Sequence, residues 1–261
     1  MLRTPTRGPA RPPLDGRAAE AYLRLLGGVG ERADAIGPDR QIASHWPFVG
    51  SNYRGLMIAG QALERWDSPA TTATWRVEEA RTAEGRERIF YGTQAWATRE
   101  REPISEVMRH GNRRGTPFWG FSQRAAELLE PTEGGPWLSR YAWWNVYPLG
   151  WQDRHGTPTG DLHAVQTPFV ADLFWAVAEE LGVNRLLLVS GKDWWSNVRE
   201  LLGLQALHAA EKPMIAAGTV RGISVVATYH PGAHMAGVSR DSFAAAAVEA
   251  MRSVSVGAMA P

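Results

Sequence analysis

The sequence of 261 residues contains no cysteine. This absence excludes disulfide bonds, thiolate catalysis, cysteine-based zinc sites and iron–sulfur clusters. No apolar run approaches the ~18 residues that a membrane-spanning helix needs. The first 16 residues are rich in Pro, Gly and Arg and lack the apolar stretch of a signal peptide. We therefore expect a cytoplasmic protein with no membrane association, in which residues 1–16 form a disordered tail.

Three widespread motifs are absent as well. The sequence has no GxxxxGK[ST] phosphate loop, no GxGxxG dinucleotide fingerprint and no GxSxG nucleophile elbow. Their absence argues against a P-loop nucleotidase, a Rossmann dehydrogenase and an α/β-hydrolase.

The charge is almost balanced, with 28 basic and 27 acidic residues, which neither requires nor excludes nucleic acid. Lysine is scarce, because Lys192 and Lys212 are the only two, and arginine suits bidentate phosphate contacts. Five arginines, interleaved with Glu, form a basic stretch at Arg99, Arg101, Arg109, Arg113 and Arg114. This stretch is either a contact to a DNA backbone or a solvated face of mixed charge. Twelve Trp are present, several in loop-like contexts where they could stack on bases.

The apolar pattern alternates between strands and helices from residue 56 onward. It predicts strands at 56–60, 141–149 and 184–191 and two more within 214–231, and helices at 17–36, 121–130, 167–182, 192–203 and 239–254. Residues 62–116 show no clear period, apart from a short helix expected at 104–111. This alternation predicts an α/β fold, a three-layer sandwich with a central, mostly parallel sheet, formed by residues 17–261 as a single domain.

In such a sheet, ligands bind at the carboxyl ends of the strands. The residues at these ends are Gly60-Gln61 after the first strand, Asn145 at the end of the second, Ser190-Gly191 after the third and His230-Pro231 after the last.

Two of these residues have more than one interpretation. His230 either caps the sheet or is held there for chemistry, and the spacing to His234 also resembles a metal pair. However, Pro231 interrupts any helix between the two histidines, and the sequence shows no third ligand, so we predict no metal and no organic cofactor. Asn145 either fixes the following loop or presents one donor and one acceptor to the edge of a pyrimidine.

Taken together and in this order, the three strand ends resemble the uracil-DNA glycosylase superfamily, over roughly residues 54–254. The resemblance implies that Gly60, Gln61 and Ala62 belong to the motif that positions the attacking water. It also implies that Asn145 binds a flipped base and that His230 stabilises the departing base. The loop that contains Pro231, His234 and Met235 would wedge into the duplex, and residues 64–118 would form an insertion.

The sequence departs from the family pattern at the first motif. Several branches carry Asp or Asn two residues after the Gly, followed by Pro, whereas this chain has Ala62 and Leu63. Gln61, Glu64 and Asp67 are the nearby side chains that can replace the missing group. The branches that bind an iron–sulfur cluster are excluded by the lack of cysteine.

The resemblance implies a DNA glycosylase that flips a non-standard pyrimidine out of DNA and hydrolyses its N-glycosidic bond. The base would be uracil or a bulkier modified cytosine, the latter with a role in defence against phage. Two alternatives remain open: a non-catalytic DNA-binding module on the same fold, and a hydrolase of small nucleosides.

Overall fold

The computed structural model describes the core of the chain and leaves out most of its N-terminal tail and predicted insertion. The described residues are 16–37, 39–44, 46–62, 71–72, 78–82, 84–85, 117–131, 137–151, 160–232 and 238–257. The disordered tail predicted for residues 1–16 lies outside this part of the chain except for Gly16, as do the helix predicted at 104–111 and the basic stretch from Arg99 to Arg114.

The predicted alternation of strands and helices is confirmed from residue 56 onward. The described helices are α1 (Arg17–Glu31), α2 (Ala33–Ile36), α6 (Pro117–Leu129), the 3₁₀ helix η1 (Trp137–Arg140), α7 (Asp161–Glu180), α8 (Lys192–Leu201) and α9 (Arg240–Gly257). The described strands are β1 (Gln41–Ser44), β2 (Phe48–Val49), β3 (Leu56–Ala62), β4 (Thr71–Thr72), β5 (Ala142–Tyr147), β6 (Leu149–Trp151), β7 (Arg185–Val189), β8 (His208–Ala209), β9 (Met214–Val220) and β10 (Ile223–Thr228).

The main sheet has seven strands in the order β2-β5-β3-β7-β10-β9-β8. The four central strands β5, β3, β7 and β10 are parallel to one another. At one edge β2 pairs antiparallel with β5, and at the other β9 pairs antiparallel with β10 and β8 antiparallel with β9. The sheet is therefore mixed, with the predicted parallel arrangement at its centre.

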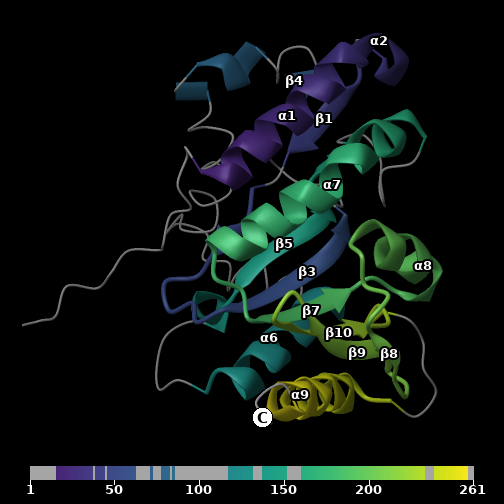
Figure 1. Cartoon of the computed structure of the whole chain (residues 1–261). Coiled ribbons are helices and arrows are strands. Elements are labelled where there is room, and N and C mark those ends of the chain that lie inside the picture. Colours follow the sequence, from purple (N-terminus) through teal and green to yellow (C-terminus); the bar gives the residue numbers. More distant parts are fainter. Residues whose placement is uncertain are drawn as a thin grey trace, which may run out of the picture.

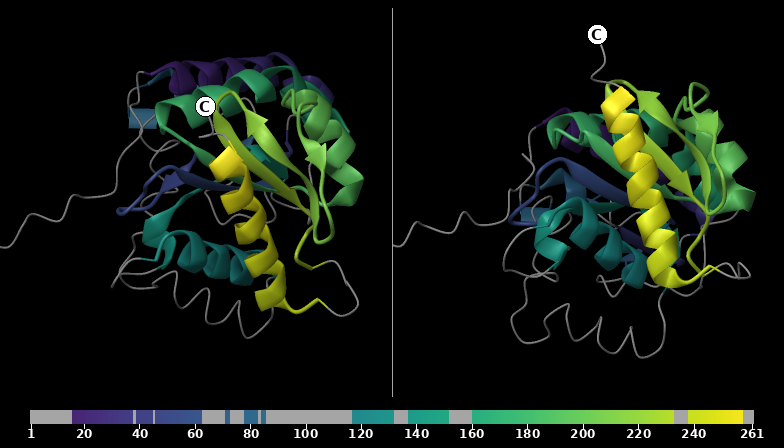
Figure 2. Two further views of the ribbon diagram at one scale, coloured as in Figure 1. Left: turned by 60° about the horizontal axis from the view of Figure 1, so that its bottom comes forward. Right: turned by 90° about the horizontal axis from the view of Figure 1, so that it is seen from below.

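Helices cover both faces of this sheet (Figures 1 and 2). One face packs against α1, α7 and α8, with large buried side chains such as Trp144 and Phe174 stacked at 5.7 Å between ring centroids. The other face packs against α6 and α9, where Phe121 and Phe243 meet edge to face at 5.2 Å. Burial on both faces explains why the central strands are continuous apolar runs rather than alternating ones.

The hairpin between β9 and β10 follows from its two turn residues. Arg221 and Gly222 both have positive φ, 53° and 76°. Two such residues form the type I′ turn whose twist matches paired antiparallel strands. The two strands predicted around this dipeptide are confirmed.

Two helix boundaries differ from the prediction. The helix predicted at 17–36 is interrupted at Arg32, whose backbone (φ −115°, ψ 21°) separates α1 from α2. Helix α7 begins at Asp161, not near Pro168, and Pro168 lies inside it. The extra turns are held by tertiary contacts, because the buried Gln166 side chain hydrogen-bonds both backbone groups of Leu149 at 3.1 and 3.2 Å.

A second, three-stranded sheet with the order β4-β1-β6 was not predicted. Its strands have two to four residues each, which is too short for a recognisable alternation. Strand β6 follows β5 after one residue, so the small sheet continues directly from the carboxyl end of β5.

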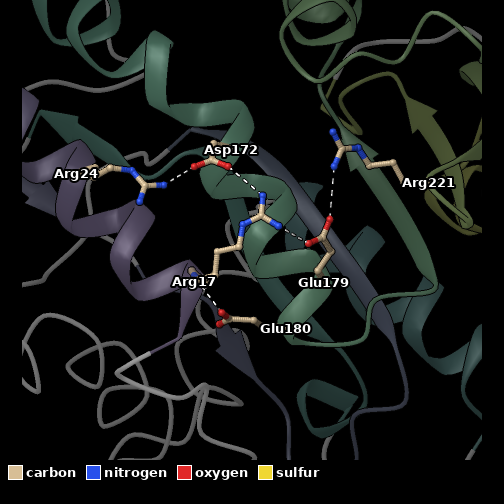
Figure 3. A network of polar contacts seen from close by, with 7 residues as sticks. Arg17, Arg24, Asp172, Glu179, Glu180 and Arg221 are labelled. Carbon is tan, nitrogen blue, oxygen red and sulfur yellow. Dashed lines mark hydrogen bonds and ion pairs between the residues drawn. The ribbon is translucent and has the colours of Figure 1, made fainter.

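An ion-pair network joins α1, α7 and the β9–β10 turn (Figure 3). Arg17 contacts Asp172 at 3.2 Å and Glu179 at 2.8 Å, Arg24 also pairs with Asp172, and Arg221 reaches Glu179 at 3.4 Å. Partial burial opposes the ionisation of Asp172, but the hydrogen bonds from Arg24 and Arg17 outweigh it and lower the pKa of this carboxyl group.

Within the described ranges, no helix is long and apolar enough to cross a membrane.

Candidate functional site

The connections between the central strands diverge at one place on the carboxyl edge of the sheet. The chain leaves β3 through α6 towards β5 on one side, and it leaves β7 through α8 towards β10 on the other. Adjacent parallel strands whose connections diverge in this way form a switch point, where α/β proteins bind ligands. The switch point lies between β3 and β7, with β5 and β10 flanking it.

Asn145 and Gly60 are direct neighbours across the β3–β5 ladder. Asn145 is only 4% exposed. Its Oδ1 lies 2.5 Å from the position that a Cβ at residue 60 would take, a distance that real Cβ atoms do not tolerate. The amide therefore occupies the space that the missing side chain of Gly60 leaves open, and any side chain at residue 60 would have to displace it.

His230 lies two residues beyond the end of β10 and is exposed. The backbone N–H of Gly232 donates a hydrogen bond to its Nδ1 at 3.1 Å. Because Nδ1 acts as the acceptor, the proton of the neutral imidazole resides on Nε2. The turn Pro231-Gly232 thus makes Nε2 the N–H donor of His230.

The ends of β7 and β10 meet at this histidine. A Cβ built at Gly191, directly before α8, would lie 3.7 Å from the Cβ of His230. Gly191 has φ 71°, so a residue without a side chain is favoured at this position. Ser190, which precedes it, is buried.

The first turn of α6 touches both halves of the site, and the sequence analysis did not identify it. Phe118 Cε2 lies 3.5 Å from the Cβ position of Gly60, and Pro117 Cγ lies 3.2 Å from that of Gly232. Phe118 is half-buried and packs edge to face on Trp119 at 5.0 Å. A half-buried aromatic ring beside Gly60 and Asn145 offers a surface on which a planar ligand can stack.

The structure thus brings together Gly60, Asn145, His230 and Pro231 with the first turn of α6. Gln61 is half-buried in β3 next to them, and the backbone of Ala62 pairs with Tyr147 of β5. The other predicted site residues, Glu64, Asp67, His234 and Met235, lie outside the described residues.

Nothing in the described part of the chain groups three or more His, Asp or Glu side chains in a way that could hold a metal ion. The groups that the site does present are a buried amide, an imidazole N–H donor and an aromatic ring. Such groups recognise a planar, neutral or anionic heterocycle by hydrogen bonding and stacking.

The sequence was also compared with known proteins. No protein-family model matches the chain, and no curated protein matches its sequence.

Proposed function

We propose that this protein is a DNA glycosylase of the uracil-DNA glycosylase superfamily. It hydrolyses the N-glycosidic bond of a non-standard pyrimidine, uracil or a bulkier modified cytosine, after the nucleotide has been flipped out of DNA. The observation that carries this proposal is the convergence of Asn145, His230 and Phe118 at one switch point, since these groups match three needs of base excision.

The first need is recognition of the base. An amide presents one donor and one acceptor, which is the pattern of a pyrimidine edge. The burial of Asn145 against Gly60 fixes the direction of this amide before any ligand arrives. Preorganised polar groups bind with a smaller entropic cost than mobile ones.

The second need is stabilisation of the leaving group. When the glycosidic bond breaks, its electron pair goes to the base, so negative charge develops on the heterocycle while the sugar becomes oxocarbenium-like. A neutral imidazole with its proton on Nε2 can donate a hydrogen bond to that charge, and the Gly232 contact selects this tautomer. Such a donor strengthens as the transition state forms, which is the condition for catalysis.

The third need is a surface for the extruded base. Taking a base out of the stack costs a few kcal/mol, and stacking on an aromatic side chain recovers part of this energy. Phe118 lies beside the position where Asn145 would hold the base edge.

Water then attacks the anomeric carbon from a position near Gln61, with Glu64 or Asp67 as candidate bases on the following segment.

The test is a panel of oligonucleotides and phage DNAs that carry different modified pyrimidines, scored for abasic sites. We expect one or more substrates to be cleaved by the wild type and to be cleaved much more slowly by His230→Ala. Binding without abasic sites across the whole panel would favour the non-catalytic module, and cleavage of free nucleosides alone would favour the small-molecule hydrolase.

A further inference from the structure

Three aromatic side chains from three different elements meet on the other side of the carboxyl edge. Tyr147 ends β5, His163 lies in the first turn of α7 and Trp194 lies in the first turn of α8. The ring centroids are 4.6 Å apart for Tyr147–His163, 5.8 Å for Tyr147–Trp194 and 5.6 Å for His163–Trp194. We call these three residues the aromatic rim.

The aromatic rim is joined to the candidate site at both ends. Tyr147 follows Asn145 by two residues on β5, and Trp194 follows Gly191, the neighbour of His230, by three residues. The first turn of α6 contacts Gly60 and Gly232 on one side of the carboxyl edge, and the aromatic rim lies on the side of α7 and α8.

The three rings differ in their exposure to solvent. Tyr147 is only 1% exposed, so it supports the other two rings from below the surface. His163 and Trp194 are half-buried, so each keeps part of its surface in contact with solvent. Burial lowers the pKa of His163, so its ring is neutral at neutral pH, and its Nε2 has no hydrogen-bond partner among the described residues.

The position of this surface indicates what it would accept. Phe118 packs on the side of the sheet that α6 and α9 cover, whereas Tyr147 and Trp194 pack on the side that α7 and α8 cover. Two successive bases that reach both surfaces are not stacked on one another, so each needs an aromatic surface of its own.

The charges near the aromatic rim favour a base over a phosphate. Asp161 and Asp193 lie in the first turns of α7 and α8, where they occupy the positive ends of the helix dipoles. Their carboxylates repel a phosphate group, and Lys192 is the one cation in the described first turns of these two helices. A neutral heterocycle meets no such repulsion.

We propose that the aromatic rim is a second stacking site, which holds the base of the nucleotide next to the flipped one through Trp194 and His163. This inference rests on the proposed function, because it places a DNA strand across the same edge of the sheet. In this arrangement the protein binds a locally unstacked strand of at least two nucleotides. Phe118 contacts the first base and Trp194 contacts the second.

The experiment compares oligonucleotides that are made resistant to cleavage by a 2′-fluoro group on the target sugar. Each carries either a normal base or an abasic analogue at the 5′ or the 3′ neighbour. For the wild type, loss of one of these neighbouring bases should weaken binding about tenfold, the scale of one base–aromatic stack.

The protein variants identify the surface. In Trp194→Leu the ratio of the Kd values without and with the neighbouring base should fall from about ten towards one. Trp195 is a half-buried Trp of the same helix outside the aromatic rim, so Trp195→Leu should keep the tenfold ratio. If Trp194→Leu does not fold, as judged by circular dichroism, His163→Leu replaces it, with the same expected loss.

A neighbour-independent Kd in the wild type, or an unchanged dependence in Trp194→Leu and His163→Leu, overturns the inference. Base release from the unmodified oligonucleotides separates this outcome from the proposed function. Base release with a Kd that does not depend on the neighbouring base contradicts the second stacking site alone. A neighbour-dependent Kd without base release contradicts the glycosylase activity alone.

Discussion

Asn145 Oδ1 lies where a side chain of Gly60 would be, 2.5 Å from the Cβ position on the neighbouring strand. The two residues are paired in the parallel ladder, so their backbones are fixed relative to one another and a side chain at residue 60 would have to displace the amide. This contact makes Gly60 a positioning residue for the amide.

Replacement of Gly60 by Ala should displace the Asn145 amide and reduce single-turnover base release at least tenfold, or about 1.4 kcal/mol. The matched control is Gly27→Ala in α1, where an added Cβ meets nothing within 4 Å. That control should stabilise the protein by about 0.5–1 kcal/mol, because glycine is a poor helix former. Full base release by Gly60→Ala would show that the amide direction does not matter.

Replacement of His230 by Ala should slow the chemical step by roughly 10²–10³, the typical cost of one hydrogen-bond donor to developing charge. DNA affinity should change little, because the donor acts on charge that forms only in the transition state. Single-turnover rates and Kd measured on the same oligonucleotide separate the two effects. Equal rates for variant and wild type would leave His230 as a structural cap of β10.

The water-positioning role is predicted from the sequence alone. Since Ala62 stands where several family branches carry Asp or Asn, the role passes to a neighbour on the same segment. We expect Glu64→Gln or Asp67→Asn to slow base release at least tenfold, or about 1.4 kcal/mol, with DNA binding intact. If both variants and Gln61→Ala keep full activity, the water is held from outside this segment.

The ion-pair network predicts a pH-dependent contribution to stability. Because the folded-state pKa of Asp172 is lowered, its contribution is complete above the unfolded value of about 3.9 and is lost as the pH falls through the folded value. Asp172→Asn should therefore lower the Tm at pH 7, by no more than about 4 °C because the pairs are solvent-exposed.

At a pH below the folded value, the Tm of Asp172→Asn and that of the wild type should converge. The control is Asp39→Asn, an exposed Asp outside the network, which should leave the Tm unchanged at both pH values. A difference between Asp172→Asn and the wild type that persists in acid would show that Asp172 acts through packing rather than through its charge.

The sequence predicted the strand ends of the site because each is marked locally. Gly60, Asn145 and His230 each follow buried apolar residues, but β3 and β5 continue for two residues beyond Gly60 and Asn145, so these two lie inside the strands rather than after them. The pairing of Gly60 with Asn145 was not predictable, because it depends on the register between two strands 80 residues apart. The register comes from the packing of both sheet faces, which no local pattern contains.

The aromatic residues were predicted less well. Trp46 and Trp151 stand in loop-like contexts but are buried, at 0% and 4% exposure, whereas Trp194 from a predicted helix lies on the aromatic rim. Phe118 was missed because the helix was expected to begin at residue 121. The signal that could have found it is Pro117, since Pro favours the first position of a helix.

The measurement that tests the central claim most directly is mass spectrometry of what the protein releases from the preferred substrate of the panel, in the presence of EDTA. We predict that the wild type releases the free modified base, leaving the sugar–phosphate backbone intact, and that Asn145→Ala and His230→Ala release it at least tenfold more slowly. Release of a nucleoside or nucleotide in place of a base, loss of release in EDTA, or equal release by the two variants would contradict this account.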